Sequence, residues 1–387
     1  MFSLSQIGEV LKYLPRGEFD KIVREHRGDR YVKRFGCQQL LVTMICGQLM
    51  QARSLRQLEV GINQHRNHHY HIGLQGVNRS TLADANAKRK PVVFEELAKL
   101  LINLAGRSMR KSREEMLYLL DSTCIPLLGR GLQWAGQLAT RIPGLRLHVL
   151  YASNQQLPVY FSITGENVPD VVEGRTIPLE REAIYVFDKG YCDYEWWSRI
   201  DAAGASFVTR LKKNAAVQVQ RVRPLDHLAQ NVLSDCEIGF RHPSNRGGHR
   251  NAYAGGTLRR IEVLRDNGER LVLVTNDLQS PASRIAALYK ERWQIELFFK
   301  WIKQNLKIKS FLGESDNAIR IQLLTALITY LLVKIKNAAS GEKLSLRQDI
   351  DRLRTGLFLR PREEESRWRR TNRLRRLMEA TQPELFR

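Results

Sequence analysis

The spacing of apolar residues changes character twice along the chain, and the first change comes near residue 107. Before it, apolar side chains recur at intervals of three and four, which is typical of helices that bury one face. Residues 1–107 are therefore predicted to form an all-helical domain with polar and basic connectors. The clearest helical runs are QQLLVTMICGQLMQ (38–51), SLRQLEVGINQH (54–65) and VVFEELAKLLINLAG (92–106).

From Glu115 the apolar residues form short runs bounded by turn residues, which favours strands. With a helical segment at 192–204 among them, these runs predict a mixed α/β sheet in a first core segment, 108–214. Residues 215–278 alternate in the β manner and contain the hairpin signal Asp-Asn-Gly, so a β-rich insertion is predicted there. The core strands are expected in EMLYLLDST (115–123), LRLHVLYAS (145–153), QLPVYFSITG (156–165), AIYVFDKG (183–190) and SFVTRLK (206–212).

The segment 281–305 predicts one long helix. It contains no internal Gly or Pro after its start, and Ser280 and Pro281 stand where an N-cap and first turn would be. At about 100° per residue, an apolar stripe runs beside a narrower polar one, as in a solvated amphipathic helix or in a site for metal and phosphate. The apolar stripe holds Leu288, Ile295, Phe299, Ile302 and Leu306, and the polar stripe holds Tyr289, Arg292, Glu296 and Lys303.

A second apolar segment, 319–333, contains Arg320 and Gln322. It is shorter than the about 20 residues that cross a bilayer, so we predict a buried core helix and assign 279–337 to a second part of the sheet domain. The last segment, 338–387, is a basic tail with six arginines between residues 367 and 376. Such a run fits a phosphate-binding helix or a solvated one.

Charge narrows the range of partners. The 387 residues carry a formal net charge of +22 and a pI near 10.1, which favours a polyanion, either nucleic acid or an anionic membrane surface. The N-terminus lacks a signal-peptide pattern, and the five cysteines form no Cys-x-x-Cys pair. We therefore expect a soluble, reduced, cytoplasmic protein whose helical N-terminal domain reads DNA or caps the next domain.

Two acids are expected at the ends of strands. Asp121 and Asp188 each follow an apolar run, and acids in that position lie at the open edge of an α/β sheet, where ligands bind. With Glu296 on the long helix, three carboxylates converge, and these are suitable ligands for two Mg²⁺ ions in an in-line phosphoryl transfer. Asp170 is an alternative to Asp188 as the second ligand. No Gly-x4-Gly-Lys-Ser/Thr motif occurs, so an ATP-driven mechanism has no support.

The long helix carries the spacing Tyr-x2-Arg-x3-Glu-x6-Lys from Tyr289 to Lys303. In this it resembles bacterial insertion-sequence transposases of the DDE type, the branch with this YREK signature. The resemblance spans about 110–336, and STLADANAKRKP (80–91) resembles the helical domain that often precedes that core. Further similar boxes are LLDST (119–123), FDKGYCDY (187–194), FVTRLKKN (207–214) and NAIRIQLLTALITYLL (317–332).

The resemblance implies a ribonuclease H-like core with the β-rich insertion between Asp188 and Glu296. It implies cut-and-paste movement of an insertion sequence by end cleavage and strand transfer, with Asp121, Asp188 and Glu296 as the catalytic triad and as ligands of two Mg²⁺ ions, for which Mn²⁺ can substitute. The implied partners are double-stranded DNA of the terminal inverted repeats and of the target, bridged by a homodimer in the bacterial cytoplasm at the nucleoid.

The resemblance further implies that Tyr289, Arg292 and Lys303 contact DNA phosphates near the cut. An arginine fork and a lysine point charge suit that role, although both cations are also spaced to pair with Glu296. The remaining DNA-binding candidates are Lys189, Arg210 and Lys212.

Alternatives remain for the reaction as a whole. The chain also fits a catalytically inactive DNA-binding regulator derived from a transposase, or a DNA nuclease without strand transfer. Some relatives cut through a DNA hairpin and hold a flipped base on a Trp of the insertion, but residues 215–278 contain no Trp. Phe240, Tyr253 and His242 are the candidates for stacking there.

Overall fold

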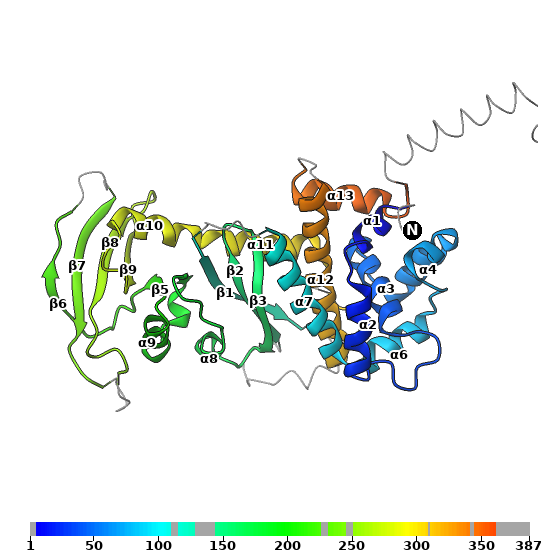
Figure 1. Cartoon of the computed structure of the whole chain (residues 1–387), viewed down its shortest axis with the longest axis horizontal. Coiled ribbons are helices and arrows are strands. Elements are labelled where there is room, and N and C mark those ends of the chain that lie inside the picture. Colours follow the sequence, from blue (N-terminus) through cyan, green and yellow to red (C-terminus); the bar gives the residue numbers. More distant parts are fainter. Residues whose placement is uncertain are drawn as a thin grey trace, which may run out of the picture. The chain divides into compact units, whose positions relative to one another are not determined.

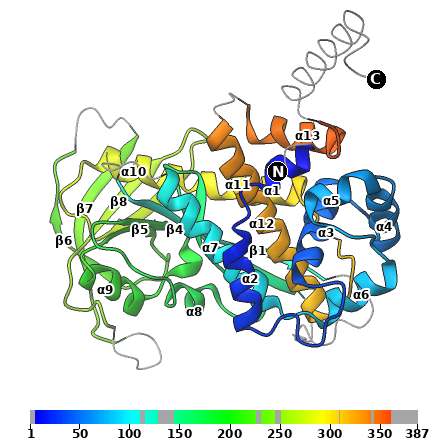
Figure 2. The same cartoon turned by 45° about the vertical axis from the view of Figure 1, so that its right-hand side comes forward.

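The computed structural model describes residues 5–109, 115–127, 144–225, 231–244, 251–308, 310–340 and 344–360, and Figures 1 and 2 show it in two views. The described residues form two compact units. A helical unit holds the residues up to Leu101 and from Ile302 onward, and a sheet unit holds those between Ile102 and Trp301. All five cysteines are free.

Side-chain caps begin several helices of the helical unit. Ser5, Ser54, Asn78 and Ser345 each accept a hydrogen bond from a backbone N–H in the first turn of the following helix, which satisfies donors that have no partner within the helix. The predicted all-helical N-terminal region is confirmed. Its elements are α1 (Gln6–Leu11), α2 (Arg16–Glu25), α3 (Cys37–Leu49), α4 (Leu55–Asn63), η1 (Arg66–His68), α5 (His69–Ile72), α6 (Arg79–Lys88) and α7 (Pro91–Met109), joined by α12 (Asp316–Ser340) and α13 (Leu346–Gly356).

The predicted core helix is α12, and it packs against α3 and α6 of the same unit. Its buried residue Gln322 has polar atoms that bond to the backbone, since Nε2 donates to the carbonyls of Lys307 and Ser310 at 2.7 and 2.9 Å. These bonds offset the cost of burying an amide. Among the described residues, α12 is the one helix long and apolar enough to cross a membrane, and 83% of that apolar window is buried within the protein.

The sheet unit is built on one nine-stranded mixed sheet with the order β3-β2-β1-β4-β5-β9-β8-β7-β6. The strands are β1 (Leu117–Pro126), β2 (Gly144–Ala152), β3 (Leu157–Gly165), β4 (Ile184–Phe187), β5 (Ser206–Arg210), β6 (Val217–Val222), β7 (Val232–Phe240), β8 (Leu258–Leu264) and β9 (Arg270–Thr275). β1 pairs antiparallel with β2 and parallel with β4, and β5 pairs parallel with β4. This five-strand part has the ribonuclease H-like arrangement that the resemblance implied, and the α/β fold class is confirmed.

The predicted β-rich insertion supplies β6 to β9. These strands extend the core sheet, because β9 pairs antiparallel with β5. The predicted Asp-Asn-Gly turn joins β8 to β9, and Gly268 there has φ +80°, a conformation that favours glycine. Arg259 on β8 and Asp235 on β7 are both buried and form a two-pronged ion pair of 2.8 and 2.6 Å.

Helices cover both faces of the sheet, as Figures 1 and 2 show. They are α8 (Asp170–Gly174), the single turn η3 (Lys189–Tyr191), α9 (Tyr194–Ala202), α10 (Ala282–Glu291) and α11 (Trp293–Asn305). On the face of α8 and α9, Trp196 packs on Phe187 with ring centroids 4.6 Å apart. On the other face, α10 contacts β4 and β5, and its residue Ile285 is fully buried. Successive strand residues point to alternate faces, so either face receives every second side chain.

Two predicted elements differ from those observed. The single helix predicted over 281–305 is wrong at Arg292, where the chain divides into α10 and α11. There the N–H of Arg292 bonds to the carbonyl of Tyr289 and the N–H of Ile295 to that of Arg292, and such i→i+3 bonds tighten a helical turn. The prediction that a strand ends at Asp121 is also wrong, because β2 pairs with β1 as far as Pro126.

Candidate active site

Parallel pairing of β1 with β4 brings Asp121 beside Asp188. Leu120 pairs with Phe187, so each aspartate is the next residue after the last pair of this ladder. Leu120 and Phe187 belong to the core on the α9 face, and the two aspartates therefore point to the opposite face, toward α10 and α11. Neighbouring strands lie about 4.8 Å apart. The two carboxylates are therefore attached to adjacent backbone positions, although they are far apart in the sequence.

Arg210 stands at the same level on the next strand. Val208 of β5 pairs with Val186 of β4, and two residues further on Arg210 reaches Asp188. The Nη1 atom of Arg210 is 4.0 Å from Oδ1 of Asp188, and the Oη atom of Tyr289 is 3.5 Å from the same oxygen. The structure thus brings two predicted site residues, Arg210 and Tyr289, to the carboxylate of a third, Asp188.

Arg292 joins the other two acids. Its Nη2 donates to Oε1 of Glu296 at 2.6 Å, and its Nη1 lies 3.5 Å from Oδ2 of Asp121. Its Nε is buried with no hydrogen-bond partner in the described structure, so the guanidinium has unused donor capacity. The pairing of Arg292 with Glu296, weighed above as an alternative to phosphate binding, is therefore present in the protein without DNA.

The electrostatics of this cluster favour a further cation. Burial raises the pKa of Asp121 to about 6, and the charges of Glu296 and Asp188 act in the same direction. The N–H of Ser122, 2.8 Å from Oδ1 of Asp121, opposes this rise. Burial also raises the pKa of Tyr289 to about 12, so its hydroxyl keeps its proton at neutral pH and serves as a donor.

The three carboxylates fit a divalent cation in their chemistry. Carboxylate oxygens are the ligands that Mg²⁺ and Mn²⁺ prefer, and Asp121, Asp188 and Glu296 meet on one face of the sheet unit. Within the described ranges, no group of three or more His, Cys, Asp or Glu side chains is arranged to hold a metal as it stands. The guanidinium of Arg292 lies between Asp121 and Glu296 and contacts both.

An open cleft of about 660 Å³ borders Tyr289, Arg292 and Glu296. Its other wall includes the β8–β9 turn, and its cationic lining residues are Arg210, Arg265, Lys290 and Arg292. Trp293, which is 58% exposed, also lines it. A cleft with cationic walls and carboxylates at its side suits a polyanion whose reacting group lies at the acids.

Arg265, Lys290 and Trp293 are among the lining residues that were not predicted as site residues. Lys290 and Trp293 fill variable positions inside the Tyr-to-Lys spacing, and their places directly after Tyr289 and Arg292 were the signal available in the sequence. Arg265 gives no such signal, because its position depends on β9 pairing with β5.

The other predicted DNA-binding residues lie in different places. Lys189 is exposed directly after Asp188, and Lys212 is exposed with its Nζ 3.3 Å from the carbonyl of Cys192. Lys189 therefore borders the Asp188 end of the site, and Lys212 lies beside the segment that follows η3. Lys303 is half-buried on the last part of α11, which belongs to the helical unit.

Asp170 does not join the carboxylate cluster. Its Oδ1 accepts hydrogen bonds from Ser122 Oγ at 2.7 Å and from Arg146 Nη1 at 2.8 Å, with His148 Nδ1 at 3.6 Å. Ser122 points to the α8 face, opposite to Asp121. Asp170 therefore ties β1 to β2 from behind the site, and this position does not support the alternative that it is the second ligand.

The aromatic residues considered for base stacking differ in access. Tyr253 is buried, and Phe240 packs on Tyr194 with ring centroids 4.5 Å apart. His242 is exposed. Of these three side chains, only that of His242 lies outside the core. The described part of the insertion therefore presents no large exposed aromatic ring on which a DNA base could stack.

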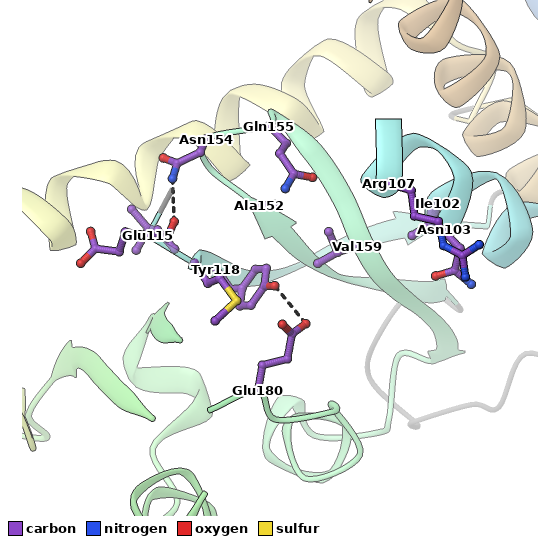
Figure 3. A pocket seen from close by; sticks show the side chains of 13 residues that line it. Ile102, Asn103, Arg107, Glu115, Tyr118, Ala152, Asn154, Gln155, Val159 and Glu180 are labelled. Atoms are coloured by element: carbon purple, nitrogen blue, oxygen red, sulfur yellow. Dashed lines mark hydrogen bonds between the residues drawn. The ribbon is translucent and has the colours of Figure 1, made fainter. Parts of the chain in front are cut away.

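A smaller pocket of about 240 Å³ lies at the start of β1 and is shown in Figure 3. Tyr118 Oη donates to Glu180 Oε1 at 3.0 Å, and Asn154 Nδ2 donates to the carbonyl of Glu115 at 2.6 Å. Two carboxylates and the single cation Arg107 line it, a balance that does not favour a polyanion. None of the predicted site residues takes part in it.

Comparison with known proteins agrees with this geometry. Residues 112–332 match the family described as Transposase DDE domain, and residues 3–75 match a domain of unknown function, DUF4372. Protein y4zB of Sinorhizobium fredii, whose name describes a transposase, is 45% identical over 66% of this chain and 70% of its own length. A Geobacillus stearothermophilus protein, named for transposition of insertion sequence element IS5377, is 28% identical over 67% of this chain and 68% of its own.

Among solved structures, a piggyBac transposase synaptic complex with hairpin DNA aligns over 91% of this chain and 79% of that one, with a TM-score of 0.48 and 9% identity. The family match covers more than half of the chain, from before Asp121 to beyond Glu296. The chain therefore belongs to the DDE transposases of insertion sequences, enzymes of DNA phosphoryl transfer.

Proposed function

We propose that the chain catalyses cut-and-paste transposition of an insertion sequence, with Asp121, Asp188 and Glu296 as its catalytic triad. The observation that supports this most directly is the meeting of these acids. Two aspartates stand side by side on β1 and β4, and Glu296 is joined to Asp121 through Arg292. The proposed reaction is hydrolysis at the element end, followed by attack of the freed 3′-hydroxyl on target DNA.

Transposases of this family use divalent metal ions, and we propose two Mg²⁺ ions held by the triad, with Mn²⁺ as a substitute. When bound, such ions activate the attacking oxygen and stabilise the leaving oxygen. The chain itself gathers the three carboxylates, whose crowding contributes to the raised pKa of Asp121. Asp121, Asp188 and Glu296 would hold the ions, and Arg292, which contacts two of these acids in the protein without DNA, would bind a DNA phosphate with its two-pronged fork.

The DNA strand being cut is proposed to lie in the cationic cleft. Tyr289, protonated at neutral pH, donates to a phosphate oxygen beside Asp188, and Arg210 supplies a positive charge at the same strand level. Lys189 and Lys212 extend the positive surface past Asp188, and Lys303 acts as a point charge further along α11. The partners we propose are the terminal inverted repeats and target DNA, with the N-terminal helical domain contributing to end binding and a homodimer bridging two ends.

The test is cleavage of labelled DNA carrying the element's terminal repeat, with Mg²⁺, Ca²⁺ or EDTA. Glu296→Gln should abolish cutting because it removes a metal ligand and leaves the shape unchanged. Glu291→Gln is the matched control, since Glu291 bonds to Ser153 at 3.1 Å and lies outside the acid cluster. Asp121→Ala and Asp188→Ala should also lose cutting and keep end binding.

The products separate the proposal from its alternatives. Strands joined to target DNA support a transposase, and cut ends that are never joined support a nuclease. Tight binding without cutting under any metal supports an inactive regulator. Equal activity of Glu296→Gln and Glu291→Gln would remove Glu296 from the triad.

A further inference from the structure

The connection between α2 and α3 gathers positive charge on the surface of the helical unit, and it is coloured dark blue in Figures 1 and 2. We call residues 24–34 the basic loop. No ion pair involves any of its cations within the ranges that the structure describes. The exposed cations are Arg24, Arg27, Arg30, Lys33 and Arg34.

The basic loop contains two acids, of which Glu25 is exposed and Asp29 is turned toward the protein. Oδ1 of Asp29 accepts a hydrogen bond from the N–H of Cys37 at 2.8 Å and lies 3.6 Å from Nε of Arg89. Asp29 therefore helps to begin α3 and is not available to neutralise the cations of the loop. With five exposed cations against the one exposed carboxylate of Glu25, the outer side keeps an excess of positive charge.

The backbone of the basic loop is held in an unusual conformation. Arg27 and Tyr31 have φ values of +50° and +62°, a region that non-glycine residues rarely enter and that costs energy. Gly28 is packed so closely that an added Cβ would lie 3.0 Å from a methyl group of Val93. The fold thus holds the loop in one shape, and strain of this kind gathers at binding sites.

Tyr31 completes the surface. Its ring is 87% exposed, the guanidinium of Arg30 lies 4.8 Å from the ring centroid, and Nη2 of Arg30 donates to its hydroxyl at 2.8 Å. Because the hydroxyl oxygen accepts that bond, its own proton remains free to donate to an anion. Tyr31 is also the one large apolar side chain that the loop exposes, so an apolar partner does not fit.

We propose that the basic loop binds the phosphate backbone of duplex DNA, and that this is a function of the domain matched by DUF4372. The proposal deepens the proposed function and rests on it for the identity of the DNA, which is the element's end. Charge complementarity supports it, since five unpaired cations and a hydroxyl donor face solvent on a fixed backbone. Phosphate contacts position a protein without reading sequence, so the loop should strengthen binding to any duplex.

The test uses the full-length chain with Arg27, Arg30 and Lys33 all changed to Ala. The matched control removes three exposed cations of the same unit that pair with neighbouring acids, namely Lys12, Lys88 and Lys99. Fluorescence anisotropy gives the Kd for a terminal-repeat duplex and for an unrelated duplex of the same length, in EDTA, from about 50 to 200 mM salt. Thermal unfolding of both variants checks that the fold is intact.

For the loop variant we expect the magnitude of the slope of log K against log salt to decrease by about 2 to 3 on both duplexes. The reason is that each lost phosphate contact lowers the magnitude of this slope by about 0.9. Tyr31→Phe should weaken binding to both duplexes without changing the slope, because it removes a neutral donor. The control variant should keep the wild-type slope. An unchanged slope in the loop variant, or equal falls in loop and control variants, would overturn the proposal.

A parallel cleavage assay with the wild type distinguishes failure of the loop proposal from failure of the proposed catalytic function. If the wild type cuts at the element boundary and the loop variant keeps its slope, the loop proposal fails alone. If the wild type cuts no DNA but the loop variant loses slope, the loop binds DNA and the catalytic proposal fails.

Discussion

Replacing Asp121 by Asn removes a negative charge whose burial destabilises the folded chain. The pKa of Asp121 is raised from 3.8 to about 6, mainly by burial. Because one pKa unit corresponds to about 1.4 kcal/mol, ionising this carboxyl at neutral pH costs about 3 kcal/mol more in the folded chain than in the unfolded one. The Asn side chain resembles the protonated acid and keeps an oxygen for the N–H of Ser122.

The sign of the effect depends on pH. The pKa of Asp121 is higher in the folded chain than in the unfolded one. The contribution of protonated Asp121 to folding stability is therefore fully present below about pH 4 and is lost as pH rises through about 6. Asp121→Asn should therefore match the wild type near pH 4 and exceed it by about 3 kcal/mol above pH 7. For a unit of this size, that difference corresponds to roughly 5–10 °C in Tm.

The assay is thermal unfolding of both proteins in EDTA between about pH 4 and pH 8. Asp266→Asn is the control, because Asp266 is exposed in the β8–β9 turn, and it should show no such gain. Added Mg²⁺ should raise the Tm of the wild type more than that of Asp121→Asn, since an ion that binds only the folded state stabilises it. No gain in Tm for Asp121→Asn at pH 7.5, or the same gain at every pH, would show that burial does not penalise the charge of Asp121.

Three further substitutions test other parts of the structure. Arg292→Ala should weaken binding to the cut site and lower the salt slope by about 1, and a slope equal to that of the wild type would speak against phosphate contact. Asp170→Ala removes the acceptor of Arg146 and Ser122 behind the site and should lower the free energy of unfolding, measured by urea titration, by roughly 1–3 kcal/mol. Asp170→Asn should lose less stability in the same titration, and equal losses would mean that the charge on Asp170 is unimportant. Ile295→Ala, at a fully buried position, should lose about 2–5 kcal/mol in the same titration, and a loss below about 1 kcal/mol would show that α11 packs loosely there.

Local patterns in the sequence were enough to identify most of the elements. Three-and-four spacing identified the N-terminal helices, and alternation identified the strands of the insertion, because both patterns report directly which side chains are buried. The Asp-Asn-Gly turn and the end of β4 before Asp188 were also visible, since turns depend on a few adjacent residues. The Tyr-to-Lys spacing pointed to the cluster on α10 and α11. Tyr289, Glu296 and Lys303 lie on these helices as expected, and Arg292 lies at the break between them.

Other features follow only from contacts between distant residues. The break at Arg292 needs no Gly or Pro, so periodicity does not reveal it. Asp121 lies within a strand because β2 continues the pairing beyond it, and Asp170 faces the opposite side because Ser122 and Arg146 hold it there. Arg265 reaches the cleft only through the pairing of β9 with β5.

The sequence by itself thus determined which residues carry the chemistry and in which kinds of element they lie. Tertiary structure alone decided that Asp121 stands beside Asp188, that Arg292 reaches Asp121, and that α12 packs with the N-terminal helices. The physical reason is that helix and strand patterns record burial over a few residues. Strand register and ion pairing, in contrast, are set by long-range packing, which local patterns do not encode.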